Sequence, residues 1–338
     1  MAGMGNDVAR LHHVGHLVRN MAQALTLYQR LGFRVPPPSY PTMAARKGAA
    51  PQPFGAANTH ADFPRSFVEL ATYVQEDGVH HLPHDAHLVP LQAPPEVLPR
   101  LIEQIGRTSA NLAVFLDRFE GLHILMFSSP DIDAAAARLT ETGVGHGGVH
   151  TVTRPVQHRG EARTEVVRYL EISSNEIGAK PGCVTEGRVG VVADLDPDIQ
   201  GTRQLDHPNG ALDLIGTMLC IADDQLTAVQ RRYEDYLDQP ARTDGPAHVF
   251  DLDGATLTLV PASQLATVLP GEHPAALPAF VGYTVAVHDI ALTRDLLRRN
   301  GFPLRHSASG DLFVPSTAAL GAAIAFRQAT PHTTEAGT

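Results

Sequence analysis

The chain has 338 residues and a formal net charge of −10 at pH 7, and its 43% hydrophobic and 18% charged residues are typical of a folded globular protein with more than one domain. Its Lys and Arg residues are scattered, so we expect no nucleic-acid partner, because binding a phosphate backbone requires clustered positive charge. Two cysteines without a CxxC pair, and apolar runs too short to cross a membrane, favour a cytoplasmic protein with no membrane partner.

One pattern recurs four times along the chain: an apolar strand, a turn carrying Asp or Asn, a helix rich in Ala and Leu, and then shorter strands. The four copies begin at Leu11, Leu122, Leu214 and Val281. The residues expected to cap the four helices are Asn20, Asp131, Asp223 and Asp289. Three of the helices are followed by a glycine, Gly32, Gly143 and Gly301. The last strands expected in the four copies are Ser66–Tyr73, Val166–Ser173, Ala255–Pro261 and Ala322–Gln328.

Each copy is a β-α-β-β-β unit whose sheet leaves one face bare, so the units must pair. We expect a metal-bearing N-terminal pair over residues 8–175 and a degenerate C-terminal pair over residues 210–328. Residues 176–209, which are rich in Gly, Pro and Asp, are expected to link the pairs, and residues 329–338 to form a disordered tail. A helix starting near Glu96 is expected to join the first two units.

Three short segments carry a family resemblance: LHHVGHLV from Leu11, GAANTHADF over Gly55–Phe63, and HPNGA over His207–Ala211. With these segments and the repeated unit, the chain resembles the vicinal oxygen chelate superfamily, and most closely its glyoxalase-like group. In that superfamily two βαβββ modules pair into a cup, and the first and last strand of each module supply metal ligands. The resemblance implies an α+β fold of four βαβββ modules paired into two glyoxalase-like, cup-shaped mixed sheets.

Carried onto this sequence, the resemblance implies a metal held by His13, Glu69, His123 and Glu171. Glu69 and Glu171 each stand between apolar residues of a strand, and a buried carboxylate needs a cation or hydrogen bonds. Two imidazoles and two carboxylates suit one divalent metal such as Zn, Ni, Co, Fe or Mn. One misfit remains: His13 stands seven residues before Asn20, whereas His123 stands eight before Asp131. A bulge over residues 128–130 would absorb the extra residue and turn His123 toward the cup.

Other polar residues are assigned lesser roles. Asn58, His60 and Arg154 are expected near the mouth of the cup, where they could contact substrate. His16 is expected to pack in the core, and His207 to order a turn. A cluster of four histidines is expected to form a loop at the cavity rim: His80, His81, His84 and His87.

The ligand set favours a metal-dependent isomerase, epimerase or lyase that acts on a small oxygenated metabolite. The metal would stabilise an enolate, and Glu69 or Glu171 would serve as the general base. One alternative is an Fe(II)-dependent ring-cleaving dioxygenase with one carboxylate outside the metal's ligands. The other is a metal-free, ligand-sequestering protein like the bleomycin-resistance members. The third and fourth units offer no His or carboxylate at the ligand positions, which leaves them as a scaffold, a lid or the surface of a homodimer.

Overall fold

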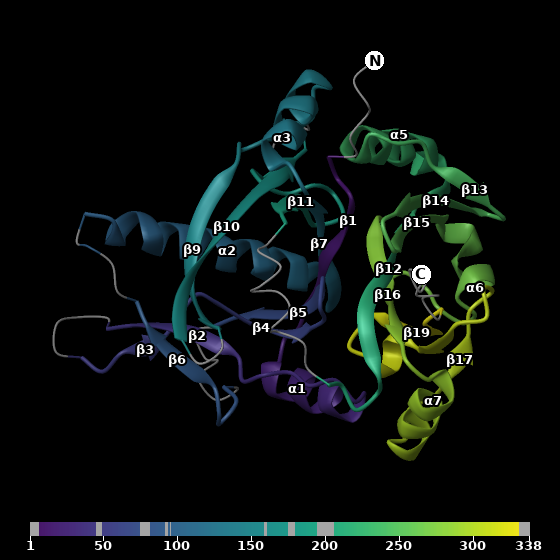
Figure 1. The fold of residues 1–338 in the computed structure, drawn as a ribbon, viewed down its shortest axis with the longest axis horizontal. Coiled ribbons are helices and arrows are strands. Elements are labelled where there is room, and N and C mark those ends of the chain that lie inside the picture. Colours follow the sequence, from purple (N-terminus) through teal and green to yellow (C-terminus); the bar gives the residue numbers. More distant parts are fainter. Residues whose placement is uncertain are drawn as a thin grey trace, which may run out of the picture.

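The computed structural model describes residues 7–44, 49–74, 82–91, 94, 96–158, 161–174, 180–194 and 206–330, and within these ranges the side chains of 154–158 and 161–163 are not described. Its strands and helices form an α+β fold in which one module occurs four times (Figure 1). In every module the last strand pairs in parallel with the first. The predicted fold class, four βαβββ modules in two pairs, is confirmed.

The N-terminal half contains two modules. The first is built from β1 (Arg10–Leu17), α1 (Met21–Arg30), β2 (Ser39–Met43), β4 (Ala56–Asp62) and β5 (Phe67–Tyr73), with β3 (Gln52–Pro53) and β6 (His87–Pro90) beside β2. The second is built from β7 (Gly121–Ser129), α3 (Ile132–Glu141), β9 (His150–His158), β10 (Glu161–Ser173) and β11 (Arg188–Ala193), with β8 (Gly145–His146) beside β10. Because β1 and β7 pair antiparallel, the strands follow the order β4, β5, β1, β7, β11, β10 and β9.

The last strand of the second module differs from the prediction. It is β11, which pairs in parallel with β7, whereas the predicted last strand over Val166–Ser173 is part of β10 and lies one position further out. β11 falls inside the segment 176–209, for which the sequence predicts a linker. Its RVGVVA sequence holds three buried valines, but this apolar run is short and lies within a segment rich in Gly, Pro and Asp. The N-terminal sheet therefore extends to Ala193.

The C-terminal half repeats the plan. Its third module is built from β12 (Ala211–Ile221), α5 (Leu226–Leu237), β13 (Arg242–Asp244), β14 (Ala247–Leu252) and β15 (Ala255–Pro261). Its fourth is built from β16 (Ala279–Val287), α7 (Ile290–Arg299), β17 (Arg305–His306), β18 (Leu312–Val314) and β19 (Ala323–Gln328). The short α6 (Leu265–Val268) lies between the two, and three 3₁₀ turns complete the half: η3 (Asp223–Gln225), η4 (Ala262–Gln264) and η5 (Ser316–Ala318). The first strands β12 and β16 pair antiparallel, as β1 and β7 do.

The two halves stand back to back (Figure 1). Val14 and Leu125 from the N-terminal sheet share one buried cluster with Leu219 and Val285 from the C-terminal sheet. Side chains alternate across a strand, so the opposite face of each sheet points away from this shared core. Each half consequently has a concave face of its own, and the two concave faces are directed away from one another.

Helix α2 (Leu98–Arg118) occupies part of the N-terminal concave face. Its Leu112, Phe115 and Leu116 pack against Leu17 of β1 and Ile124 of β7. Nearer the N-terminus of the helix, Ile105 approaches Gly55 so closely that a Cβ on this glycine would lie 2.2 Å from Ile105 Cγ2. The predicted joining helix is therefore confirmed, and it also covers the floor of the cup. None of the helices in the described ranges is long and apolar enough to cross a membrane.

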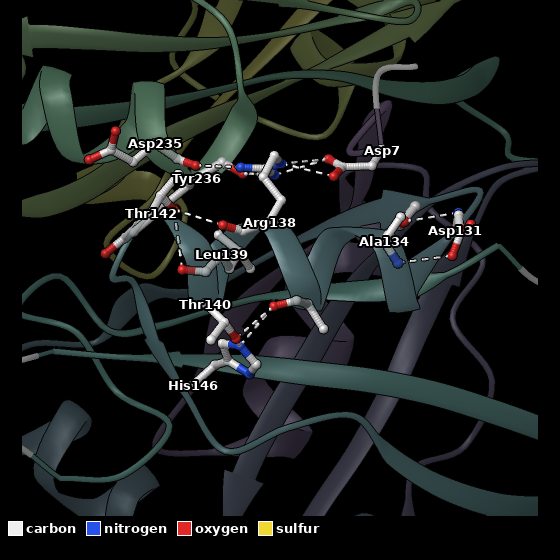
Figure 2. Close-up of polar contacts among 12 residues, drawn as sticks. Asp7, Asp131, Ala134, Arg138, Leu139, Thr140, Thr142, His146, Asp235 and Tyr236 are labelled. Atoms are coloured by element: carbon white, nitrogen blue, oxygen red, sulfur yellow. Dashed lines mark hydrogen bonds and ion pairs between the residues drawn. The ribbon is translucent and has the colours of Figure 1, made fainter. Parts of the chain in front are cut away.

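Arg138 on α3 joins the halves at one end of the interface (Figure 2). Its Nε donates to Asp7 Oδ2 at 2.8 Å, and its terminal nitrogens donate to the carbonyl oxygens of Asp235 at 2.6 Å and Tyr236 at 3.0 Å. Those carbonyls belong to the last turn of α5, which has no further helical N–H groups to pair with. One guanidinium thus fixes the N-terminal segment to the end of a helix in the other half.

Three of the four predicted helix caps are confirmed. Asn20, Asp131 and Asp289 each accept a backbone N–H from the first turn of their helix. The expectation for Asp223 is wrong, because it opens the 3₁₀ turn η3 and accepts a hydrogen bond from Ser263 N at 3.0 Å instead. The glycines predicted to follow three helices adopt positive φ angles, as expected: Gly32, Gly143 and Gly301.

Candidate functional site

Two of the four predicted metal ligands lie together on the concave face of the N-terminal half. His13 on β1 and Glu69 on β5 approach to 3.9 Å between Nε2 and Oε2. Glu69 is oriented by Asn58 on β4, whose Nδ2 donates to Oε1 at 2.8 Å. Asn58 therefore contacts a predicted ligand, as its placement near the cup suggests. His13 and Glu69 form an ordered pair of potential donors.

A cluster of imidazoles surrounds this pair. The ring of Phe67 stacks on His13 and packs against His60, with centroids 4.4 Å away in both cases. His12 meets the same ring edge-on at 5.2 Å, and its Nδ1 lies 2.7 Å from His13 Nδ1. His60 also faces Glu69 across the β4–β5 pairing. His12 is not among the predicted site residues, although the adjacent histidines of LHHVG are a visible signal in the sequence.

The structure places His123 away from this pair. The pairing of β7 with β1 skips His123, so the extra residue is absorbed at His123 itself and not over residues 128–130. The His123 ring is fully buried between Phe115 and Phe119, with centroids at 5.3 and 4.1 Å, and its Nε2 donates to Phe119 O at 3.0 Å. Burial, together with the nearby Arg118 and His16, outweighs the hydrogen bond to Phe119 O and lowers the pKa of His123 to about 4, so the ring is neutral.

Glu171 lies on the concave face but on a strand further from β1 than predicted. It projects from β10, where its Oε1 accepts a hydrogen bond from Nε of Arg188 on β11. Burial of Arg188 would lower its pKa, but the carboxylates of Glu171 and Glu69 outweigh burial and raise the pKa above its usual value. Arg188 therefore stays charged between the two glutamates that the sequence assigned to a metal.

The strand pairing shows which residues take the ligand positions in the second module. His13 stands seven residues before the cap Asn20, and the same position before Asp131 is Ile124. Glu69 pairs with the residue two after His13, and the corresponding partner in β11 is Gly190. The second module thus offers an aliphatic side chain and a glycine where the first offers an imidazole and a carboxylate.

The predicted four-ligand metal set does not fit this arrangement. Protein metal sites commonly use three or four side-chain ligands, and His13 with Glu69 supplies two. His123 is enclosed by phenylalanines, and Glu171 is bonded to a cation. Across the described parts of the chain, no group of three or more His, Cys, Asp or Glu side chains is arranged to hold a metal ion.

A cavity of about 580 Å³ opens on this face between α2, β10 and the loop before β11. Three cationic side chains line it, Arg107, Lys180 and Arg188, together with one carboxylate, Glu171. Tyr169, Ser173 and His150 add polar groups. None of these three cations is predicted from the sequence, where the one signal is Arg188 at the head of an otherwise apolar strand.

The other residues singled out from the sequence lie outside the His13–Glu69 pair. His16 is a core residue, as expected, and is fully buried. His207 orders a turn, since Nδ1 accepts from Arg34 N at 3.0 Å and Nε2 bonds Asp62 O at 2.9 Å. Arg154 pairs with Glu165 across β9 and β10, and its side chain is outside the described set. His84 and His87 are exposed, and His80 and His81 lie outside the described residues.

The chain is similar to a known domain family and to several solved structures. The sequence profile of a glyoxalase-like domain matches residues 11–237, and no curated protein matches the chain. A hypothetical protein from Staphylococcus aureus aligns with a TM-score of 0.54 and 8% identity, covering 95% of this chain and 100% of its own.

Two enzymes of known type share the fold at a slightly lower TM-score. A mutant 4-hydroxymandelate synthase from Streptomyces coelicolor aligns with a TM-score of 0.50 and 14% identity, over 95% of this chain and 92% of its own. A catechol 2,3-dioxygenase aligns with a TM-score of 0.50 and 10% identity, over 96% and 89%. At these identities the likeness is one of fold.

Proposed function

Because the chain belongs to the glyoxalase-like domain family, we propose that its N-terminal cup binds a small oxygenated metabolite that carries a carboxylate. The observation that carries the proposal is the charge of the cavity lining, where Arg107, Lys180 and Arg188 face one carboxylate. This local excess of positive charge stands out in a chain with a formal net charge of −10. A cavity lined by one sign of charge concentrates ligands of the other sign.

Arg188 is the anchor of the proposed site. Its Nε is committed to Glu171, and its two terminal nitrogens form no hydrogen bond with any described residue. About a third of the side chain, 30%, remains exposed. A guanidinium with free N–H groups on one edge binds a carboxylate through two parallel hydrogen bonds. The volume of about 580 Å³ suits a small organic molecule.

This proposal differs from the metal-dependent enzyme favoured by the sequence. Both the isomerase and the ring-cleaving dioxygenase require at least three metal ligands, and no three His, Cys, Asp or Glu side chains of the described residues are arranged to hold a metal ion. The dioxygenase has no more support than the isomerase. The metal-free alternative, a protein that holds its ligand through side chains alone, agrees better with an arginine between the two glutamates.

Binding can be tested by titration calorimetry with a panel of 2-oxo and 2-hydroxy carboxylic acids, each paired with its uncharged amide. We expect at least one acid to bind while its amide does not. Arg188→Met should weaken binding about tenfold or more, since a charge-assisted pair contributes about 1.5–3 kcal/mol. The matched control is Arg168→Met, which removes an arginine that is paired with Asp133 on α3 and does not line the cavity. Equal affinities in wild type and Arg188→Met would contradict the proposal.

A second candidate function follows from the position of Glu171. Its carboxylate lines the cavity beside Arg188, so it could take a proton from the carbon next to a bound carbonyl or carboxylate, while the guanidinium stabilises the enolate. Returning the proton to another face or a neighbouring carbon would give an epimerase or isomerase. NMR detection of hydrogen–deuterium exchange at that carbon in D₂O measures the step directly. We expect exchange to stop in Glu171→Gln while binding persists; binding without exchange in wild type would leave the protein as a ligand-sequestering one.

A further inference from the structure

The C-terminal half has a cup of its own, with a cavity of about 570 Å³. It opens on the face of β12, β15, β16 and β19 that points away from the shared core. Its floor is made of small residues, among them Gly216, Gly282, Ala323 and Ala325. Val268 and Leu269, at the end of α6, contribute apolar walls. The floor of this cup is not filled by a helix in the way that α2 covers the N-terminal one.

The small residues occupy the positions that correspond to the predicted metal ligands. Gly282 stands seven residues before the cap Asp289, as His13 does before Asn20. Gly216 is its counterpart in β12. The two strands are antiparallel and related by a local two-fold axis, which superimposes the pair Gly216–Thr284 on the pair Gly282–Met218. The partners that correspond to Glu69 are Thr258 on β15 and Ala325 on β19. Glycine, threonine and alanine therefore replace metal-binding side chains at these four positions.

Threonine hydroxyls converge on the open space above Gly216. A Cβ placed on Gly216 would lie 3.4 Å from Thr256 Oγ1 on one side and 3.4 Å from Thr284 Oγ1 on the other. The hydroxyls of Thr256, Thr258 and Thr284 form no hydrogen bond with any described residue. By contrast, Thr217 uses its hydroxyl within the fold, donating to Gly282 O at 3.1 Å. Three half-buried hydroxyls are thus available to a ligand, each able to donate and to accept.

The charges at the rim of this cup are balanced. Arg327 donates to both carboxylate oxygens of Asp311, at 2.8 and 2.7 Å. Arg242 donates to Asp244 at 3.0 Å and to Asp251 at 2.7 Å. The lining therefore contains two cations and two carboxylates, all engaged in ion pairs with one another or with Asp251. An anionic ligand would find no free partner here, unlike in the N-terminal cup.

We propose that the C-terminal cup is a second binding site, which takes a small uncharged organic molecule bearing hydroxyl or carbonyl groups. The threonine hydroxyls supply directional hydrogen bonds, and the glycine and alanine floor admits an apolar ring or chain. No metal takes part, because the corresponding positions carry Gly, Gly, Thr and Ala. The site stands independently of the function proposed for the N-terminal cup.

The test measures the binding of two probes of similar size, cyclohexane-1,2-diol and 2-hydroxycyclohexane carboxylate. Binding of each probe to the full-length protein is detected by saturation-transfer NMR. We expect the neutral diol to bind wild type at millimolar concentration. The isosteric double variant Thr256→Val, Thr284→Val should weaken binding of the diol about tenfold or more, since each lost hydrogen bond is worth about 0.5–1.5 kcal/mol.

Two controls locate the effect. Arg188→Met in the N-terminal cup should leave binding of the diol unchanged. Gly216→Val, which plugs the space between the two hydroxyls, should abolish it, and circular dichroism shows whether each variant is folded. Absence of diol binding in wild type, unchanged binding in the folded threonine double variant, or a threonine-dependent preference for the carboxylate would each overturn the proposal.

Discussion

Tyr28 and Tyr283 meet hydroxyl to hydroxyl, 3.0 Å apart, at the boundary between the two halves of the molecule. Tyr28 Oη also lies 2.9 Å from His16 Nδ1, and His16 Nε2 lies 2.8 Å from the carbonyl oxygen of Leu320. All three side chains are buried. A continuous line of hydrogen bonds therefore runs from α1 and β1 to β16 and the turn before β19.

Removing the Tyr28 hydroxyl should lower the free energy of unfolding more than removing the Tyr283 hydroxyl. Tyr283→Phe leaves Tyr28 bonded to His16, so we expect a loss of about 1 kcal/mol. Tyr28→Phe leaves both His16 Nδ1 and the Tyr283 hydroxyl without this partner, and should cost about 2–3 kcal/mol. Urea denaturation of both variants and the double variant measures the coupling. Additivity within about 0.3 kcal/mol would show that the two hydroxyls do not interact energetically.

Stability should fall on mild acidification. Burial lowers the pKa values of His16 and His123 to about 4, whereas both histidines titrate near 6.5 when unfolded. Between pH 6.5 and 4 the unfolded chain binds protons that the folded chain does not. The free energy of unfolding should therefore drop as pH falls through this window, by up to about 1.4 kcal/mol per pH unit for each histidine. Above pH 6.5 these two groups add no further slope.

The histidine share of this pH dependence can be isolated by substitution. His123→Leu keeps the pocket between the phenylalanines apolar and should remove about half of the slope that His16 and His123 contribute. His84→Gln alters an exposed histidine and should leave the slope as it is in wild type. Thermal or urea unfolding at half-unit pH steps gives the comparison. A slope that survives unchanged in His123→Leu would show that the pKa of this ring is the same in the folded and the unfolded chain.

Metal content should be low. With two converging ligands, we expect less than about 0.1 equivalent of Zn, Ni, Co, Fe or Mn to remain after incubation and desalting of untagged protein, measured by elemental analysis. His13→Ala should retain no less metal than wild type. About one equivalent in wild type, lost in both His13→Ala and Glu69→Ala, would contradict this expectation and restore the metal-dependent enzyme, with iron favouring the dioxygenase.

Gly55 should resist substitution because of α2. Its φ of +80° strains any other residue, and its Cβ would lie 2.2 Å from Ile105 Cγ2. Gly143 is the matched control, with a φ of +76° and no atom within 4 Å of its Cβ position. We expect Gly143→Ala to cost about 1 kcal/mol of unfolding free energy, and Gly55→Ala about 1–3 kcal/mol more. Adding Ile105→Ala to Gly55→Ala should restore part of the additional loss of unfolding free energy. Equal losses at the two glycines would show that α2 can move away from Gly55 at little cost.

The repeated strand–helix pattern was sufficient to predict the modules, because their caps, glycines and apolar strands are local features. Asn20, Asp131 and Asp289 cap helices as their spacing indicates. β11 was missed because five of its six residues read as an isolated apolar run within a polar segment, and only pairing with β7 makes them a strand.

The candidate site was harder to predict from the sequence because it depends on register. His13 and Glu69 could be placed together, since a first and a last strand of one module are neighbours. His123 could not, because a bulge of one residue redirects its side chain, and no local pattern shows which strand position will bulge. Arg188 was hard to recognise for the same reason as β11, because this strand is identified only through its pairing with β7.

The shared core between the halves constrains how this protein can vary. Val14 and Leu125 would face water in a chain that stopped at Ala193, because the residues that cover them lie in the C-terminal sheet. Either half expressed alone would expose this apolar surface, so we expect neither half to be stable by itself. The concave faces of the two cups point away from this shared core, although α2 packs against part of the N-terminal one. Where no helix covers the floor, as at Gly216, a substitution can change what the cup binds without exposing the core that joins the halves.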